Sequence, residues 1–384
     1  MHTVIIGGGI VGLASAYYLK QRNVDVTVLE KGTLGSGSTD RANGGIRAQF
    51  SSPVSAELSL ASIEVWETFD EEFDTEITYR QPGYLFLART DETADRFREN
   101  VRKQNKIGVS SEFVTPEQAS ELCPALRTEE FVGGTYSPTD GFADPHLGLQ
   151  GFSIAANDAG VDIRTKVEVK DVICANDGSV SGVETDQGRI DADFVVNATG
   201  PWAAQVGKMV DLSLPVSPRR RQLVIVDPET SVPDTVPFTI DADASVHFRP
   251  ERDGNVVAGG HFTDLDPEMD PDEYSNRVSL EWAAQVVEEA AKCADYFGPR
   301  SEIRQSWAGL YAVTPDHHPI IEEAIPGFIN AVGFSGHGFM QAPATGQLVA
   351  ELIADGEAHS IDISMLSSDR FDGGSPLEEG TVID

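Results

Sequence analysis

Three glycines and one glutamate near the start of the chain have the types and spacing that bind a dinucleotide. Gly7, Gly9 and Gly12 follow an apolar run at residues 3–6, and Glu30 ends a second apolar run. Gly7 would let the chain turn tightly off a strand, Gly9 would leave room for a pyrophosphate, and Gly12 would let the next helix lie close to the sheet. The spacing therefore predicts strand, glycine turn, helix and strand.

The glutamate indicates which dinucleotide this segment would hold. A carboxylate at Glu30 can accept hydrogen bonds from ribose hydroxyls and would repel a 2′-phosphate, so FAD or NAD is favoured over NADP. The start of the helix, at Ile10 and Val11, would offer free amides and a partial positive charge to the phosphates. The alternative is a helix start that needs small residues only for packing.

A polar, glycine-rich loop over residues 35–47 is too long to be a simple connection. Loops of this length without periodicity tend to be functional. Its small residues would let the backbone approach a flat cofactor, while Arg41 and Arg47 supply fixed positive charge in a very acidic chain. A surface ion pair is the alternative for either arginine.

Apolar periodicity and capping residues predict the elements that must position these motifs. We expect helices at 55–73, 91–106 with Asp91 as its cap, from 115, 144–160, 275–294 and 344–354. We expect strands at 84–87, 131–136, 163–172, 180–185 and 193–200. The pieces between 84 and 136 form no β-α-β unit, so we assign them to a second domain.

Composition limits the classes of partner. Lys and Arg total 28 against 62 Asp and Glu, which gives a net charge of −34. This charge argues against nucleic acid or an anionic membrane as a partner. Acidic residues spread along the whole chain are typical of a halophilic protein, one that works in concentrated salt. The 40% hydrophobic content excludes a disordered chain.

The three cysteines indicate the compartment. Cys123, Cys174 and Cys293 are odd in number and far apart, so they fit neither a disulfide framework nor a metal or iron–sulfur site. We expect no bound metal and a reducing environment. No apolar run reaches membrane-spanning length, and a glycine motif that begins at residue 7 leaves no room for a signal peptide. We therefore expect a cytoplasmic protein.

Two later motifs join the N-terminal fingerprint, at residues 197–202 (Asn-Ala-Thr-Gly-Pro-Trp) and 333–340 (Gly-Phe-Ser-Gly-His-Gly-Phe-Met). With all three, the chain from residue 3 to about 365 resembles the D-amino-acid oxidase superfamily of FAD enzymes. Within it, the chain is similar to sarcosine oxidases and to the flavin subunit of dye-linked L-proline dehydrogenases. The resemblance implies FAD in an extended pose, and oxidation of a C–N bond next to a carboxylate by hydride transfer to the flavin.

The resemblance also implies a fold of class α/β with an α+β second domain. A Rossmann-type FAD-binding domain, 1–78 with 141–214 and 305–366, is interleaved with a substrate domain, 79–140 with 215–304, built on a mainly antiparallel sheet. Residues 367–384 are expected to form a loose acidic tail. The FAD contacts it implies are Gly7, Gly9, Ile10, Val11, Gly12, Glu30, Lys31, Ser38, Thr39, Arg41, Asn43, Gly44, Gly45, Ile46, Val167, Thr199, Gly200, Trp202, Gly309, Gly336, His337, Gly338, Phe339 and Met340.

Four residues match substrate-pocket positions of these relatives. Arg47 falls where the sarcosine oxidases keep the arginine of their carboxylate clamp. His261 and Tyr311 match positions over the flavin face, and His247 lies near a pocket tyrosine position. For each histidine and for the tyrosine, an ordinary hydrogen-bonded role is the alternative. The adjacent histidines His317 and His318 have no third metal ligand in view, and we interpret them as structural residues.

Departures from the family pattern refine the expectation. Gly309 replaces the cysteine that anchors FAD covalently, and Arg41 is the nearest match to an anchoring histidine, so FAD should be non-covalent. Met340 replaces a second carboxylate-binding cation, which favours a bulkier or differently held amino acid than sarcosine. Val257 replaces the lysine that helps oxidases reduce oxygen, which favours a dehydrogenase over an oxidase.

The leading hypothesis is oxidation of an amino acid or an N-methyl or other secondary amino acid that is sarcosine-, proline-, glycine- or D-amino-acid-like. The product would be an imine that water hydrolyses. One alternative is oxidation of a 2-hydroxy acid with His261 as general base. Another is a flavin subunit that works only inside a hetero-oligomeric dehydrogenase; the electron acceptor is open, and homo- or hetero-oligomers are both compatible with the sequence.

Overall fold

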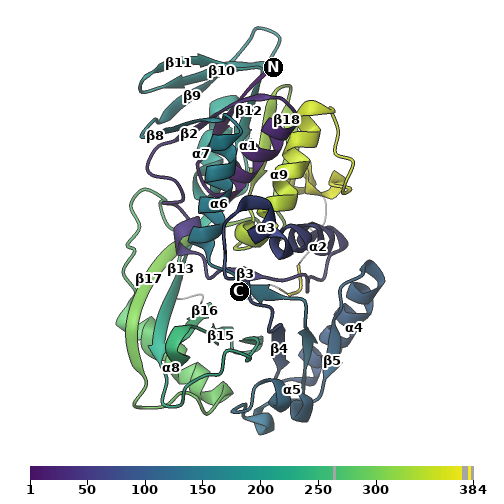
Figure 1. Cartoon of the computed structure of the whole chain (residues 1–384), viewed down its shortest axis with the longest axis vertical. Coiled ribbons are helices and arrows are strands. Elements are labelled where there is room, and N and C mark those ends of the chain that lie inside the picture. The colour runs from purple at the N-terminus through teal and green to yellow at the C-terminus, as the bar shows by residue number, and fades with distance from the viewer. Residues whose placement is uncertain (263–264, 374–378, 382–384) are drawn as a thin grey trace.

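Two β-sheets, each with its own helices, are stacked along the longest axis of the molecule (Figure 1). The structure is a computed structural model and describes residues 1–262, 265–373 and 379–381. Stretches at 2–30, 162–197 and 320–332 build the first sheet, and stretches at 84–137 and 217–313 build the second. The α/β fold class predicted from the sequence is confirmed.

The first sheet has six strands in the order β18-β19-β12-β1-β2-β8. Its strands are β1 (His2–Ile6), β2 (Asp25–Glu30), β8 (Asp162–Thr165), β12 (Phe194–Asn197), β18 (Ile320–Ile325) and β19 (Phe328–Val332). All pairings are parallel except that of the edge strand β18. Parallel strands covered on both faces need apolar side chains on both, which explains the continuous apolar runs at β1 and β12.

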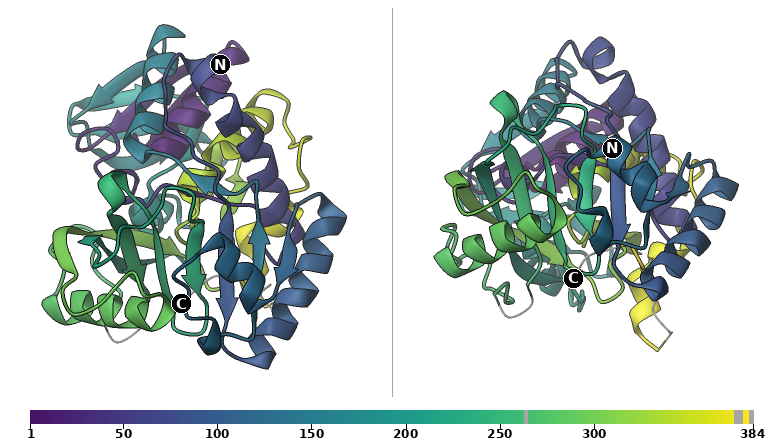
Figure 2. Two further views of the ribbon diagram at one scale, coloured as in Figure 1. Left: turned by 60° about the horizontal axis from the view of Figure 1, so that its bottom comes forward. Right: turned by 90° about the horizontal axis from the view of Figure 1, so that it is seen from below.

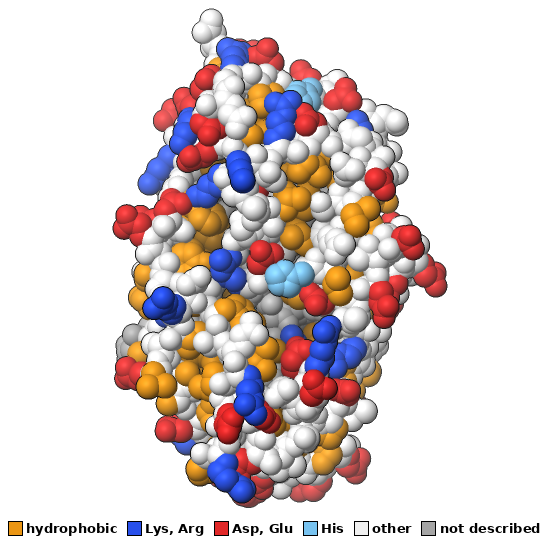
Figure 3. Space-filling model, turned by 60° about the vertical axis from the view of Figure 1, so that its left-hand side comes forward, with side chains coloured by type: hydrophobic (Ala, Val, Ile, Leu, Met, Phe, Trp, Pro, Cys, Tyr) orange, Lys and Arg blue, Asp and Glu red, His pale blue; other side chains and the backbone are white. Residues whose placement is uncertain are grey.

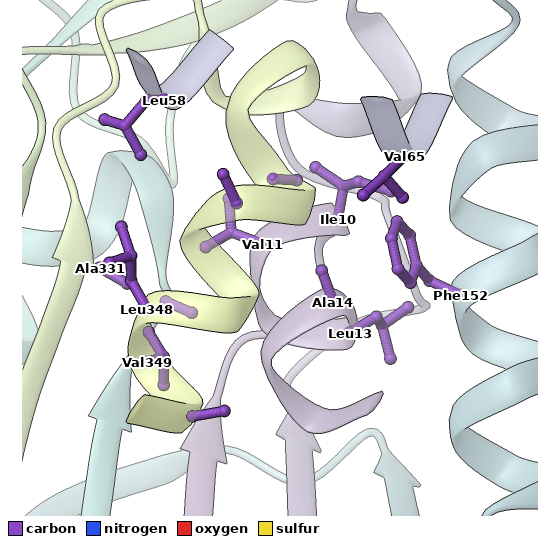
Figure 4. Packing of buried hydrophobic residues seen from close by; sticks show 14 of the residues in the cluster. Ile10, Val11, Leu13, Ala14, Leu58, Val65, Phe152, Ala331, Leu348 and Val349 are labelled. Atoms are coloured by element: carbon purple, nitrogen blue, oxygen red, sulfur yellow. The ribbon is translucent and has the colours of Figure 1, made fainter. Parts of the chain in front are cut away.

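Helices cover one face of this sheet: α1 (Ile10–Gln21), α9 (Gly338–Ala354) and α6 (Pro145–Asp158), with α2 (Pro53–Glu67) and α3 (Phe69–Phe73) outside them. Figure 4 shows α1 and α9 side by side, with Val11 of α1 and Leu348 and Val349 of α9 in the same buried cluster. Gly346 makes this approach possible, because a Cβ at this position would lie 2.7 Å from the backbone carbon of Ala14.

The other face carries a small antiparallel sheet, β9 (Val169–Cys174), β10 (Val180–Thr185) and β11 (Gly188–Asp191). Its apolar side chains share a core with alternate residues of the six-stranded sheet, such as Val4 and Ile6, and with the short helix α7 (Ala203–Gly207). Two short 3-10 helices, η3 (Gly200–Trp202) and η4 (Lys208–Val210), flank α7.

The second sheet has eight strands in the order β17-β13-β16-β15-β14-β4-β6-β5. They are β4 (Tyr84–Ala88), β5 (Glu112–Val114), β6 (Gly133–Ser137), β13 (Ser217–Asp227), β14 (Phe238–Asp241), β15 (Val246–Pro250), β16 (Val256–Gly260) and β17 (Glu302–Val313). Only the pair β4 and β14 is parallel among the pairings of this sheet in the described ranges. The expected boundary before residue 305 falls inside β17, which pairs with β13 through Val313.

Alternation along the strands gives this sheet two different faces. Leu85 and Leu87 pack with α5 (Pro116–Leu122) and α8 (Leu280–Cys293), whereas Tyr84 and Phe86 belong to a separate cluster on the opposite face. In both views of Figure 2, the blue helix α4 (Asp91–Ile107) and the green helix α8 lie towards opposite ends of the sheet. A two-stranded ladder, β3 (Gly45–Ile46) with β7 (Gly141–Phe142), runs between the two large sheets.

Several expected elements have different bounds. The helix at 55–73 is two helices that meet at Thr68, the cap of α4 is Thr90 rather than Asp91, and α8 begins after its cap Ser279. The expected strand 163–172 is two strands in two sheets, because the chain bends at Lys166, whose φ is 57°.

The last helix begins six residues earlier than expected, at Gly338, so that Pro343 lies inside α9. A proline inside a helix frees a carbonyl and strains the ladder. Here α2 contacts the backbone on both sides of the proline: Trp66 Nε1 donates to the Met340 carbonyl at 2.9 Å, and the Ala344 amide donates to Ser62 Oγ at 3.2 Å. These contacts let the helix continue through the proline to the motif at 336–340.

The expected loose tail makes specific contacts wherever it is described. Arg370, in a short 3-10 helix at Ser368–Phe371, forms an ion pair with Asp316 at 2.7 Å. Glu379 is buried and binds backbone amides of residues 51 and 52. The rest of the expected tail, 374–378 and 382–384, lies outside the described residues.

No helix within the described ranges is long and apolar enough to cross a membrane. On the face shown in Figure 3, acidic and basic side chains are interspersed, with apolar side chains between them. That face therefore carries no large area of a single charge.

Candidate active site

One continuous cavity of about 600 Å³ runs from the turn after β1 to the face of the eight-stranded sheet that is opposite α8. Every residue predicted to bind the cofactor or substrate lines it, except Gly12 and Ile46. Gly12 instead lets α1 pack closely, since a Cβ there would lie 2.0 Å from the Gly7 carbonyl oxygen. Ile46 is fully buried in the core beside the helices.

The glycine turn leaves the first turn of α1 open towards the cavity. Gly7 has a φ of +112°, and a Cβ on it would lie 2.5 Å from the Ala198 carbonyl oxygen, so only glycine fits. Gly9 is the N-cap of α1 and makes no side-chain cap, and the first turn holds no acid. The Ile10 amide donates to Thr39 Oγ1 at 3.2 Å. The remaining amides of this turn face a space suited to an anion.

Glu30 lines the same end of the cavity and is held by backbone amides. Its carboxylate accepts from the amides of Gly8 at 2.9 Å and Gly32 at 2.6 Å. The Val167 amide donates to the Glu30 carbonyl at 3.0 Å.

A charged and aromatic group forms the neighbouring wall. Lys31 Nζ lies 4.0 Å from the centre of the Trp202 ring, and both side chains bind Asp272, at 2.7 and 2.9 Å. Thr199 and Gly200 line the cavity beside them. Gly200 has a φ of +55° and open space where a Cβ would be, which leaves the backbone accessible to a ligand.

The loop before β3 forms the middle of the cavity. Ser38 Oγ donates to the Leu310 carbonyl at 2.6 Å, and the Arg41 guanidinium donates to carbonyls of its own loop, including that of Gly37 at 2.6 Å. Gly309 lies against Arg41, because a Cβ there would be 2.8 Å from Arg41 Cβ.

Asn43 brings an unused donor to this loop. Its carbonyl oxygen and Oδ1 accept from Arg249 Nε at 3.0 and 2.8 Å. Its Nδ2 is shielded from solvent and has no partner in the part of the chain that the structure describes. Beyond it, Gly44 has a φ of +80°, and a Cβ on Gly45 would lie 1.9 Å from the Tyr84 hydroxyl.

A second helix start faces the cavity at α9. Its N-cap, His337, makes no side-chain cap, and its first turn, which includes Gly338, Phe339 and Met340, holds no acid. Gly336 has a φ of +95°, and a Cβ on it would lie 2.3 Å from the Tyr311 ring. In a chain of net charge −34, two helix starts without an acid that open into one cavity are a clear anion-binding arrangement.

Arg47 is a buried cation at the sheet end of the cavity, with 4% of its surface exposed; another arginine, Arg221, also lines the cavity and lies 5.5 Å from the centre of the Tyr311 ring. Arg47 Nη1 donates to the Gln49 carbonyl and to Thr381 Oγ1 at 3.2 Å, and its Nη2 donates to the Thr381 carbonyl at 3.3 Å. The guanidinium carbon lies 4.0 Å from the centre of the Phe50 ring. Burial lowers the pKa of Arg47, yet a guanidinium stays charged in a protein. No carboxylate within 4.0 Å neutralises it among the described residues.

His337 accepts from this arginine. Arg47 Nη2 lies 3.2 Å from His337 Nε2, and because a guanidinium can only donate, the proton of the ring sits on Nδ1. Burial and then the charge of Arg47 lower the pKa of His337 well below its usual value, so the ring is neutral.

An arc of rings forms the roof over this end. The ring centres of Tyr84 and Phe238 are stacked at 4.4 Å, and His247 follows at 5.4 Å from Phe238. His261 lies 6.1 Å from His247 and 5.7 Å from Tyr311. The structure therefore brings the four predicted pocket residues, Arg47 included, to one end of the cavity. Burial, with a contribution from Arg249, lowers the pKa of His247 to about 4, so this ring is also neutral at pH 7.

Sequence reasoning missed part of the wall. Tyr84, Phe86, Phe238 and Ile240 line the cavity from the middle of the second sheet. No pattern in the sequence separates them from core residues, because β4 is apolar on both faces and the alternation in β14 fits a core-facing strand as well. Arg221, Asp272 and Thr381 are among the other lining residues that were missed, and nothing in the sequence points to Thr381.

Three further positions discussed from the sequence are buried: Met340, Val257 and His318. Met340 is buried in the first turn of α9, and Val257 is buried outside this cavity. His318 is structural, as predicted: its Nδ1 contacts the Asp316 carbonyl and its Nε2 contacts Ser52 Oγ, both at 2.8 Å.

Comparison with known proteins identifies the family. Residues 2–352 match the family described as DAO: FAD dependent oxidoreductase. The β subunit of sarcosine oxidase from Arthrobacter sp. is 31% identical, over 98% of this chain and 92% of its own. Rat mitochondrial dimethylglycine dehydrogenase is 29% identical over 96% of this chain, which spans only 44% of the length of that protein.

Solved structures share the fold. The crystal structure of L-proline dehydrogenase from P. horikoshii has a TM-score of 0.88 at 34% identity and covers 97% of both chains. Glycine oxidase from Geobacillus kaustophilus has a TM-score of 0.84 at 28% identity, over 97% of this chain and 99% of its own. Together with the geometry above, these matches establish that the chain belongs to the DAO family of FAD-dependent oxidoreductases, a family of amino acid dehydrogenases and oxidases that bind FAD.

Proposed function

We propose that this chain oxidises the C–N bond of an amino acid or of an N-methyl or other secondary amino acid. One observation carries the proposal: the cavity ends in a buried arginine, Arg47, under an apolar and aromatic roof. The acidic residues that line the cavity, Glu30, Glu168 and Asp272, belong to its opposite end. A small carboxylate with a compact apolar body fits such a site, since a bidentate carboxylate is the natural partner of a buried guanidinium.

The rest of the cavity fits FAD. The open first turn of α1 would take the diphosphate, and the open first turn of α9 would face the electron-rich part of the flavin. Asn43 Nδ2 adds a buried donor that has no protein partner in the described ranges. We propose that FAD is non-covalent, because Gly309 and Arg41 carry no group that could form a covalent bond to it.

When bound, FAD supplies the acceptor for the hydride that leaves the carbon next to the substrate nitrogen. The chain itself supplies the carboxylate clamp, the roof that excludes water, and a positive field from Arg47 and α9. This field disfavours a protonated amine. No carboxylate or lysine lines the sheet end among the described residues, and His247 and His337 are neutral. We propose that the substrate binds with an unprotonated amine and needs no strong base; His261, which also lines this end, would be the general base only for the alternative 2-hydroxy acid chemistry.

The relatives support a narrower substrate class. They are named for sarcosine, glycine, L-proline and dimethylglycine, so we propose a sarcosine-, glycine-, proline- or D-amino-acid-like substrate.

The position of Val257 bears on the electron acceptor. Val257 places no cation in the cavity, which favours a dehydrogenase over an oxidase. One relative is named as a β subunit, which supports the alternative that this chain works as a flavin subunit within a hetero-oligomer whose electron acceptor lies on another chain. The three cysteines of the present chain are free, which supports a reducing compartment such as the cytoplasm.

An anaerobic screen of flavin reduction tests the proposal. The yellow protein is mixed in concentrated salt with proline, sarcosine, glycine, D-amino acids and matching 2-hydroxy acids, and flavin absorbance is followed. We expect at least one amine to bleach the flavin and to do so faster than its hydroxy acid. Bleaching by hydroxy acids alone, or by none of the panel, would overturn the proposal. A protein that reacts only when purified with other chains from its native source would support the hetero-oligomer.

A further inference from the structure

A short C-terminal segment, residues 379–381, which we call the C-terminal strap, enters the sheet end of the cavity. Thr381 lines the cavity, and Glu379 has 4% of its surface exposed. The strap is far in sequence from every other residue of this site, and neither the glycine motifs nor the family resemblance assigns it a role.

Glu379 anchors the strap on the N-terminus of α2. Its carboxylate accepts from the amides of Ser51 at 2.6 Å and Ser52 at 3.1 Å, and Ser52 is the N-cap of α2. A carboxylate at a helix start is favoured by the free amides and the helix dipole. These bonds lower the pKa of Glu379 despite its burial, so it is ionised at neutral pH. The Gly380 amide adds a bond to Ser51 Oγ at 2.7 Å.

The same carboxylate orients Thr381. The Thr381 hydroxyl donates to Glu379 Oε1 at 2.7 Å. Because its proton is used there, the hydroxyl oxygen can present only lone pairs to its other neighbour. That neighbour is Arg47, whose Nη1 donates to Thr381 Oγ1 at 3.2 Å.

Thr381 thereby presents two oxygen acceptors to the two terminal nitrogens of one guanidinium. Its Oγ1 takes a proton of Nη1, and its carbonyl oxygen takes a proton of Nη2 at 3.3 Å. This is the end-on fork pattern that a carboxylate makes with arginine. The other two terminal protons go to the Gln49 carbonyl and to His337 Nε2, so a second bidentate partner finds no free pair of terminal protons.

We propose that Thr381 is a built-in occupant of the carboxylate fork of Arg47, and that a substrate carboxylate must displace the C-terminal strap to bind. The inference rests on the proposed role of Arg47 as the carboxylate clamp. Occupancy of the fork by Thr381 makes the strap a determinant of specificity. A ligand with one weak acceptor cannot replace both hydrogen bonds from Arg47 to Thr381. The measured affinity for a carboxylate is then the intrinsic affinity multiplied by the fraction of molecules whose strap has left the fork.

Acetate, which has a carboxylate and no amine, is the probe for this inference. Its dissociation constant is measured on the flavoprotein from the shift in flavin absorbance. We expect Glu379→Gln, and a chain that ends at residue 378, to bind acetate about tenfold more tightly than the full chain. Glu351→Gln is the matched control, because Glu351 is also buried and accepts from two successive amides, those of His359 and Ser360 at 2.7 and 3.1 Å. It should leave the acetate affinity unchanged.

Amide hydrogen exchange gives a second readout that does not depend on flavin. At saturating acetate, the amides of Gly380 and Thr381 should exchange faster than in the free protein. Weaker or unchanged acetate binding in both strap variants, or slower exchange of these amides, would overturn the inference. Arg47→Met separates the proposed role of Arg47 from the proposed role of the strap. Loss of acetate binding in this variant would support Arg47 as the carboxylate clamp, while retained binding would contradict the proposed function itself.

Discussion

At Arg47 a full positive charge is held where water does not reach it, and its neighbours supply neutral acceptors instead of a negative charge. Burying a charge is costly unless it is paired. Phe50, the Gln49 carbonyl and the two oxygens of Thr381 stabilise the guanidinium without neutralising it. The nearest negative charge, Glu379, lies beyond Thr381 and does not contact the guanidinium. An anionic ligand that reaches Arg47 is therefore attracted by a cation that is only partly compensated, which is the physical basis of the proposed substrate class.

The state of the histidines leads to a prediction on pH. Burial lowers the pKa of His247 to about 4, so its protonated form is lost as the pH rises through about 4 and the ring is neutral above about 5. The rate of anaerobic flavin reduction at low substrate should fall as the pH drops through the pKa of the substrate amine, because only the neutral amine binds productively.

This prediction is checked with two substrates whose amines differ in pKa. The acid limb of the rate profile should move with the substrate, and it should persist in His247→Asn. A limb that stays at one pH for every substrate, or that vanishes in this variant, would instead assign proton removal to His247.

At the scale of elements, the site depends on two helix starts that are held together by one close contact. Gly346 of α9 touches the backbone of α1 at Ala14, and so the open first turns of both helices meet at one cavity. We expect Gly346→Val to force the helices apart, to lower the free energy of unfolding by about 1–3 kcal/mol, and to weaken FAD binding.

Thermal unfolding and FAD titration of the apoprotein measure both effects. Ala354→Val, the same new side chain at the exposed end of α9, is the matched control and should change neither. A Gly346→Val protein with unaltered FAD affinity would show that the spacing of these helices is unimportant for the cofactor.

Local signals made part of this arrangement predictable. Gly7, Glu30 and Asp144, whose carboxylate caps the start of α6, act on their immediate neighbours, so the strand, turn and helices around them follow from sequence alone. The helix start was predicted wrongly because proline usually marks the first turn of a helix, whereas here Ser62 and Trp66 of another helix bind the backbone on either side of Pro343. Such compensation depends on tertiary packing and leaves no local pattern.

Long-range pairings were the least predictable part of the site. Thr381 and Arg47 are 334 residues apart, and neither position belongs to a periodic pattern that points to the other. The roof from β4 and β14 was hidden for a different reason: β4 is apolar on both faces, and the alternation of apolar and polar residues in β14 is equally typical of a strand that packs on a core.

At the scale of the whole molecule, the net charge of −34 opposes the compact state through self-repulsion, which salt screens. We propose that the protein works in concentrated salt, and expect its unfolding temperature to rise by at least about 5 °C between 0.1 M and 2 M KCl. Calorimetry at neutral pH measures this. The same salt step nearer the isoelectric pH of about 4.4 is the control and should give a smaller rise. An unfolding temperature that is independent of salt at neutral pH would contradict the proposal.

The central claim is that a buried arginine receives the substrate carboxylate beside the flavin, and one titration tests it most directly. Flavin reduction is followed anaerobically against the best amine of the screen, in the full chain, in Arg47→Met and in Arg304→Met, whose arginine is exposed and paired with Asp227. We predict that Arg47→Met keeps its FAD but needs about a hundredfold more substrate for half-maximal reduction, while Arg304→Met behaves as the full chain. An unchanged half-saturation in Arg47→Met would contradict the account.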